Sequence, residues 1–227
     1  MTFFPRGALC RFGLAALIGT LPAAGASAQA ANYPSLQLPT ASTRDYTAAI
    51  ASGSGTLALF QWREGAGAGM HLGLDAGVAD YSGSSNLTVF VGGSLGREML
   101  RATNEQPLDV MLTGGVGVGF GGGSTVFRVP AGVSIGHTFR LEQGMSLTPY
   151  AHPRLSIDIC DDCGTTGSNR SEVSLNFDLG VNFQVNRQFG VRAAASFSGS
   201  DFFGDDSFAL GFNWVPSLLS NARQRAR

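Results

Sequence analysis

The most constraining feature of this sequence is an alternation of apolar and polar residues, which recurs in six segments between Met70 and Val185. One segment runs from Phe127 to Leu141, and its odd-numbered positions are apolar except for His137. The even-numbered positions carry glycine, proline, serine, threonine and arginine. Successive side chains of a β-strand point to opposite faces, so this period predicts strands with one apolar and one polar face.

The length of these segments separates two kinds of sheet. Strands of soluble sheets usually have about 5–6 residues, whereas a tilted strand needs about 9–11 residues to cross a bilayer. The segments here run to roughly a dozen residues each, which fits the longer class. A sheet in lipid must close on itself, because its backbone polar groups find no water there. We therefore predict an all-β fold, a closed antiparallel transmembrane β-barrel.

The number of strands is predicted as 8 to 10. Two further alternating segments follow Val185, and Thr56 to Arg63 brings the count to nine. Bacterial barrels close with an even number of strands, and Thr43 to Ala51 supplies a tenth because Tyr46, Ala48 and Ile50 share a face. Ten is slightly preferred. Eight would require Thr56 to Arg63 to lie outside the barrel wall.

A β-sandwich is the competing interpretation, because its strands also alternate apolar with polar residues. Glycine makes up 32 of the 227 residues and falls mostly on the polar face of these segments. Thr113, Gly115, Gly117 and Gly119 are an example. Small polar residues suit a narrow lumen better than a face open to bulk water. Strand length, this polar face and an export signal favour the barrel.

The ends of the chain divide it into four parts. Residues 1–30 are predicted to be a signal peptide, with Arg6 and Arg11 before an apolar run and small residues at the cleavage site. Residues 31–42 are a linker, 43–215 the outer-membrane barrel and 216–227 a basic tail. These parts predict export to the bacterial outer membrane. The formal net charge of −1 gives no reason to propose a nucleic-acid partner.

The polar face places ionisable residues in the predicted lumen. Four acids and four bases balance there, which indicates a stabilising charge network that plugs the barrel. A constriction that selects small solutes is the alternative. No catalytic pair is readable, since His71 and Asp75 lie about 13 Å apart along one strand. We expect no enzyme activity, no cofactor and no metal. The predicted lumen residues are Asp75, Asp109, Arg128, Arg140, His152, Arg154, Asp158, Asp178 and Arg192, with His71 and Tyr150 nearby.

The sharpest local motif is the pair Cys160 and Cys163. Half of a zinc site is one interpretation, but no second cysteine pair or histidine cluster completes four ligands. A redox-active pair lacks its usual strand-to-helix context. In an oxidising envelope a loop disulfide is the simpler hypothesis.

The long connections orient the barrel. If the tight turns at Glu142 to Gly144 and Asn186 to Gln188 face the periplasm, Cys160 to Ser171 and Gly199 to Asp206 lie outside the cell. These loops are candidates for a surface ligand. Their acids could gather calcium, and two phenylalanines between them could contact a partner. The residues concerned are Asp161, Asp162, Asp201, Asp205 and Asp206, with Phe202 and Phe203.

The last alternating segment carries Phe208, Leu210, Phe212 and Trp214. Together with the preceding strands it resembles the small outer-membrane β-barrels of Gram-negative bacteria, of the opacity-protein and OmpA-membrane-domain kind. The resemblance covers roughly Thr43 to Trp214 and concerns architecture alone. It implies contact with outer-membrane lipid and recognition by the outer-membrane assembly machinery. The expected role is structural or surface-interactive, and a narrow porin-like channel is the alternative.

Overall fold

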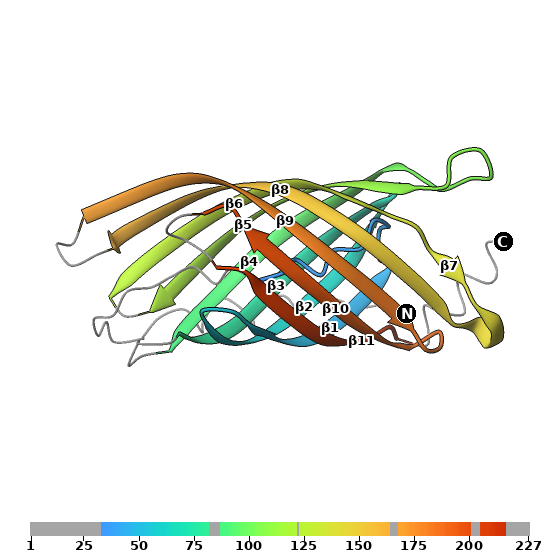
Figure 1. Cartoon of the computed structure of the whole chain (residues 1–227), viewed down its shortest axis with the longest axis horizontal. Coiled ribbons are helices and arrows are strands. Elements are labelled where there is room, and N and C mark those ends of the chain that lie inside the picture. Colours follow the sequence, from blue (N-terminus) through green and yellow to red (C-terminus); the bar gives the residue numbers. More distant parts are fainter. Residues whose placement is uncertain (1–32, 82–86, 122, 164–167, 201–204, 217–227) are drawn as a thin grey trace, which may run out of the picture.

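Ten long β-strands form one closed antiparallel barrel in the computed structural model (Figure 1). The structure describes residues 33–81, 87–121, 123–163, 168–200 and 205–216. The predicted signal peptide and most of the basic tail lie outside these residues. The elements are β1 (Arg44–Ser52), β2 (Gly55–Gly67), β3 (Met70–Tyr81), β4 (Thr88–Leu100), β5 (Asp109–Gly121), β6 (Ser124–Gly136), the two-residue β7 (Phe139–Arg140), the short 3₁₀ turn η1 (Glu142–Gly144), β8 (Ser146–Cys163), β9 (Ser168–Gln184), β10 (Phe189–Ser198) and β11 (Ser207–Trp214).

The barrel closes by pairing its first strand with its last. Consecutive strands are neighbours throughout, and β1 pairs β11 from Tyr46 opposite Trp214 to Ser52 opposite Phe208. The fragment β7 prolongs β6 after a break at residues 137–138, and both pair β8. This confirms the closed barrel and the preferred count of ten strands. Thr43 to Ala51 and Thr56 to Arg63, the weakest segments, both contribute to the wall.

No helix in the described part of the chain is long and apolar enough to span a membrane.

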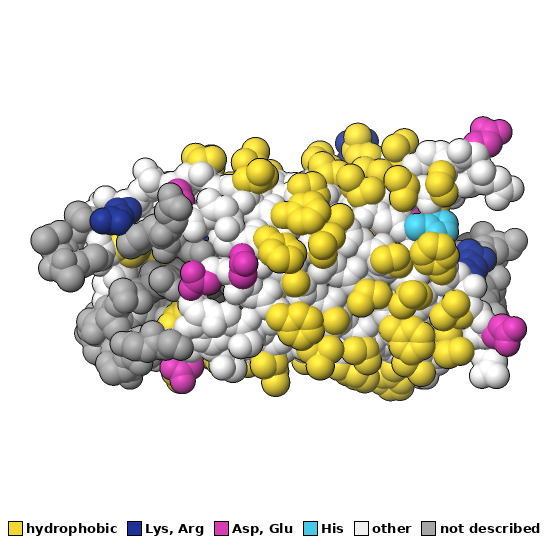
Figure 2. Space-filling model, in the orientation of Figure 1, with side chains coloured by type: hydrophobic (Ala, Val, Ile, Leu, Met, Phe, Trp, Pro, Cys, Tyr) yellow, Lys and Arg dark blue, Asp and Glu magenta, His cyan; other side chains and the backbone are white. Residues whose placement is uncertain are grey.

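The outer surface carries the apolar residues that the alternation predicts. Leu210 on β11, Leu112 on β5 and Val173 on β9 are all exposed, and their sequence neighbours point inward. Figure 2 shows hydrophobic side chains gathered around the barrel, with charged side chains concentrated towards its two ends. Exposed apolar side chains in such number are stable only against lipid. The prediction of an outward apolar face is confirmed.

Aromatic rings cluster at the end of the barrel where β1 begins and β11 ends, here named the terminal end. The rings of Tyr46 and Trp214 lie 5.4 Å apart, and those of Phe189 and Phe212 5.5 Å apart. Such rings mark the interface between a bilayer and water. The opposite end, named the loop end, carries the β8–β9 connection and the Gly199 to Asp206 connection.

Glycines on the inner face make room for large side chains of the adjacent strand. A Cβ atom at Gly180 would lie 2.2 Å from the ring of Tyr150, and one at Gly77 would lie 2.4 Å from the ring of Phe90. Both rings belong to a buried apolar cluster inside the barrel, which the sequence analysis did not predict. Its members are Leu36, Ala49, Ala51, Leu57, Leu59, Ala79, Phe90, Tyr150, Ala194 and Ala209.

A charge on the outward face tests the lipid contact. Leu210 lies four residues from Trp214, or about 10 Å along the membrane normal for a tilted strand, near the middle of an apolar band about 25 Å tall. Leu210→Arg should therefore lower the free energy of unfolding by about 2–4 kcal/mol. Urea unfolding in lipid vesicles, read by heat-modifiable gel migration, measures this. The control Leu141→Arg, beside the turn at the terminal end, should lose no more than about 1 kcal/mol, and equal losses would contradict the assignment.

Candidate functional site: the lumen

An uncharged N-terminal segment, residues 33–43, lies inside the barrel. It leads into β1 at the terminal end, where the Gly65 amide donates to the Thr43 carbonyl oxygen at 2.8 Å. Its other end reaches Tyr33, whose hydroxyl donates to Asp75 on β3 at 3.2 Å. Pro34 and Leu36 are almost fully buried. Residues 31–42 are predicted to be a linker. Nothing in their sequence pattern indicates that most of them fill the lumen.

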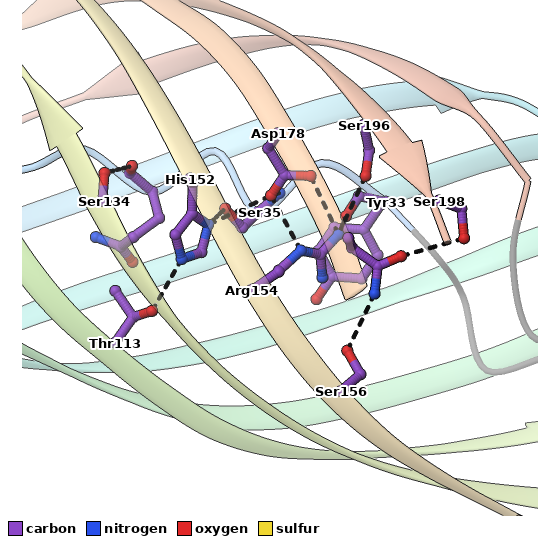
Figure 3. A network of polar contacts seen from close by, with 12 residues as sticks. Tyr33, Ser35, Thr113, Ser134, His152, Arg154, Ser156, Asp178, Ser196 and Ser198 are labelled. Carbon is purple, nitrogen blue, oxygen red and sulfur yellow. Dashed lines mark hydrogen bonds and ion pairs between the residues drawn. The ribbon is translucent and has the colours of Figure 1, made fainter. Parts of the chain in front are cut away.

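His152 on β8 joins this segment to the wall (Figure 3). Its Nδ1 lies 2.6 Å from the Ser35 hydroxyl and 3.3 Å from a carboxylate oxygen of Asp178 on β9. Its Nε2 lies 2.9 Å from the hydroxyl of Thr113 on β5. The ring is 3 % exposed. One imidazole therefore connects β8 with its neighbour β9, with β5, which only β6 separates from β8 in the wall, and with the N-terminal segment.

Asp178 is the centre of this network and is completely buried. Its carboxylate lies 3.1 Å from the Arg154 guanidinium and also accepts the Ser35 amide at 3.3 Å. Arg154 in turn donates to the Tyr33 carbonyl oxygen at 2.9 Å and to the Ser196 hydroxyl at 3.3 Å. A buried carboxylate needs this paired and hydrogen-bonded environment, because isolated burial of a charge is very unfavourable.

Three more ion pairs cross between strands. Arg128 on β6 lies 2.6 Å from Asp158 on β8. Arg63 on β2 lies 2.5 Å from Asp75 on the neighbouring strand β3. Arg192 on β10 pairs with Asp45 on β1, and β11 lies between these two strands. All eight charged partners of the four pairs belong to wall strands.

The structure brings seven of the nine predicted lumen residues into these contacts. Asp109 sits apart at the terminal end, where it accepts the Ala102 amide at 2.9 Å and holds the β4–β5 connection. Arg140 is exposed on β7. It lies at the rim of the barrel despite its inward parity. β7 pairs β8, but the described pairing of β5 with β6 ends at Asp109 opposite Gly136 and does not reach β7.

The sequence did not identify two members of the lumen ion pairs. Asp45 and Arg63 lie on the two weakest strand segments, and apolar residues occupy both faces of Thr56 to Arg63. The inward parity of Asp45, opposite to Tyr46, is a signal that would identify it. Arg63 has no such signal, because Leu57 and Leu59 share its face.

A cavity of about 110 Å³ lies between the N-terminal segment and the wall. That volume exceeds the roughly 10–15 Å³ that one water needs on such a measure. On one side it is bounded by Tyr33, Ser35 and Gln37, and on the other by inward glycines of β4 and β5. Those glycines are Gly92, Gly115, Gly117 and Gly119.

Cys160 and Cys163 form a disulfide, as predicted. Both lie on the last residues of β8 and not in a free loop. The nearby Asp161 and Asp162 are exposed, as are Asp205 and Asp206 across the loop end. Within the described residues no three potential ligands gather into a metal site. Asp201, Phe202 and Phe203 lie outside the described residues.

Comparisons with known proteins give architectural likeness. No family model and no curated protein matches the chain. Among solved structures, the β domain of the Bordetella autotransporter BrkA matches with a TM-score of 0.48 and 12% identity, over 76% of this chain and 98% of that one. The N-terminal β-barrel domain of Pseudomonas aeruginosa OprF matches with a TM-score of 0.36 and 8% identity, over 77% and 98%.

A third match is a bacterial polysaccharide outer membrane secretin, with a TM-score of 0.46 and 12% identity over 70% of this chain. The chain spans 56% of that protein's length. These barrels agree with the resemblance that the sequence indicates. The chain has the architecture of a bacterial outer-membrane β-barrel. The tight turns that the sequence predicts to face the periplasm lie at the terminal end, and the long connections predicted to lie outside the cell belong to the loop end.

The ion pair of Arg128 and Asp158 gives a stability prediction. Asp158→Asn leaves Arg128 buried without its counter-charge, so the free energy of unfolding should fall by about 3–5 kcal/mol. Replacing both partners, as in Arg128→Met with Asp158→Leu, should be much less destabilising. Urea unfolding of the three proteins in the same vesicles gives the comparison. A double variant as unstable as the single one would show that the charges are not coupled.

The disulfide gives a chemical prediction. Under non-reducing conditions a maleimide reagent should label neither Cys160 nor Cys163 in the folded, purified protein. After reduction and unfolding, both cysteines should be labelled. Peptide mass mapping reads the two states, and Cys160→Ser provides a control in which the remaining thiol is free. Labelling of both cysteines without reduction would show that the disulfide is absent from the protein in solution.

Proposed function

We propose that this protein is a closed outer-membrane barrel with a structural or surface-interaction role. The observation that carries the proposal is the filled lumen. The N-terminal segment and four ion pairs occupy the inside of the barrel, and the contacts of Ser35 with His152 and Asp178 fix the segment to two strands. Solute passage requires a continuous water-filled path, which this packing interrupts.

The charges of the lumen support a stabilising role. Four carboxylates meet four guanidinium groups in the ion pairs of the described lumen, so the paired charges balance. Asp109 and Glu98 are further acids near the terminal end. A selective pore is usually lined by rings of one sign. The role we propose is not catalytic. Hydrogen bonds connect His152 with Thr113 and with Asp178, but His152 is buried, and a reacting substrate needs access to its base.

The partners in this proposal are outer-membrane lipid, the assembly machinery that folds such barrels, and a surface ligand at the loop end. The hairpin of β8 and β9 favours the last of these. At the loop end these strands continue past β10, whose pairing with β9 stops at Ser198 opposite Asn176 (Figure 1). A projecting, disulfide-stapled hairpin is the part of the barrel best placed to meet a partner outside the cell.

A narrow channel is the second candidate. It is favoured by the cavity of about 110 Å³ beside the glycines of β4 and β5. Ten strands also enclose a wider lumen than eight. Conduction would follow if this cavity joined both ends of the barrel through water.

Planar-bilayer recording separates the two candidates. The purified, folded protein should produce no steady conductance steps in KCl, because its lumen is filled. Heat-modifiable gel migration of the same sample establishes that the barrel is folded, and a general porin recorded in the same bilayers is the positive control. Regular, protein-dependent steps from the intact protein would favour the channel and end the closed-barrel proposal.

A further inference from the structure

The N-terminal segment differs chemically from the wall that surrounds it. Residues 33–43 read Tyr-Pro-Ser-Leu-Gln-Leu-Pro-Thr-Ala-Ser-Thr and contain no acid, arginine, lysine or histidine. The wall contributes both members of each ion pair. Removing the segment would therefore leave no buried charge without its counter-charge, which is the most unfavourable consequence of removing part of a polar interior.

Side chains of the wall nevertheless bind the segment at many points, mostly through the backbone groups of the segment. Gln61 donates to the Ser35 carbonyl oxygen at 3.2 Å, and Ser134 donates to the Gln37 carbonyl oxygen at 2.7 Å. Nearer the terminal end, the Ala41 amide donates to Glu98 at 2.8 Å and the Ser42 amide donates to His71 at 3.2 Å. With the Arg154 bond to the Tyr33 carbonyl oxygen, these contacts hold an extended chain along its length.

One apolar side chain anchors the segment. Leu36 is 2 % exposed and belongs to the cluster of alanines and leucines inside the barrel. Its φ of 50° lies in the left-handed region, which is uncommon for residues other than glycine. The burial of this leucine side chain removes apolar surface from water, which offsets that backbone strain.

Part of the segment's surface is not tightly packed. The cavity lies beside Tyr33, Ser35 and Gln37, next to the part of β4 and β5 where Gly92 and Gly117 offer no side chains. Elsewhere β4 does contact the segment, because the ring centroids of Tyr33 and Phe90 lie 5.3 Å apart. The segment therefore borders open space over part of its length.

We propose that the lumen is a binding site for an extended, uncharged polypeptide, and that residues 33–43 occupy it as a removable stopper. When the stopper leaves, the barrel opens as a water-filled pore with little preference between cations and anions, because each guanidinium group of the four ion pairs is matched by a carboxylate. The inference rests on the proposed closed state of the intact protein. It adds the part of the chain that closes the lumen and the chemistry that holds it there.

Deletion of residues 33–42, with residues 1–32 kept for export, tests this directly. The folded variant should produce conductance steps in planar bilayers where the intact protein produces none. Its reversal potential in a KCl gradient should lie close to zero. Where the deletion fails to fold, a variant with a Gly-Ser repeat of equal length in place of residues 33–42 carries the same expectation, since it lacks the Leu36 anchor.

A synthetic peptide of residues 33–43 is the second arm. Added to the deletion variant on the side of the terminal end, it should block the steps in a concentration-dependent manner, and a scrambled peptide of the same composition should not. A folded deletion variant that produces no conductance steps would contradict the stopper proposal but not the proposal of a closed barrel. Conduction that the peptide does not block would overturn the binding site. Conduction by the intact protein would remove the proposed function itself.

Discussion

The pairing of β1 with β11 is the constraint on which the rest of this structure depends. In lipid every backbone amide and carbonyl group must find a partner within the protein, and a sheet achieves this only when it has no free edge. Seven residue pairs, from Tyr46 opposite Trp214 to Ser52 opposite Phe208, remove both edges at once. Closure then assigns one face of every strand to lipid and the other to the interior, which explains why the strict two-residue period dominates the sequence. It also creates a cylinder whose inside has to be occupied.

The interior is filled in three different ways around the circumference. Two ion pairs and His152 fill the side of β6, β8 and β9, and the other two pairs lie on β2 with β3 and on β10 with β1. Alanines and leucines of β1, β2, β10 and β11 also form a small apolar core. Along β4 and β5 the wall carries glycines, and the space remains a cavity. The N-terminal segment runs between these three regions and touches all of them, with Leu36 in the apolar core, Ser35 on the ion-pair network and Gln37 beside the cavity.

The sequence predicted the fold because strand parity is a local property. The outward residues of β6, β8 and β9 could be identified from neighbours two positions away, and the structure places them on the lipid face. The same parity identified Arg128, Arg154, Asp158 and Asp178 as inward residues. Their pairing needed register, because Arg128 meets Asp158 only when β6 and β8 are aligned at that pair. Register between strands is set by turns, bulges and closure together, and a single strand does not reveal it. Residues 33–43 have no period at all, so their place in the lumen had no signal.

Charge distribution separates two ways of closing a barrel. A plug that supplied one partner of each ion pair would be locked in place, since its departure would strand several buried charges at several kcal/mol each. Here both partners of each ion pair belong to the wall, and the segment offers amides, carbonyl groups, hydroxyls and apolar side chains that include Leu36 and Leu38. Some of its hydrogen bonds join charged wall groups such as Asp178 and Arg154, and these contribute about 1.5–3 kcal/mol each, whereas a neutral bond contributes about 0.5–1.5 kcal/mol. The ion pairs of the wall are therefore complete without the segment, and the closure of the lumen rests on a separate set of interactions. Under the stopper proposal, that division lets one barrel keep its fold in both a closed and an open state.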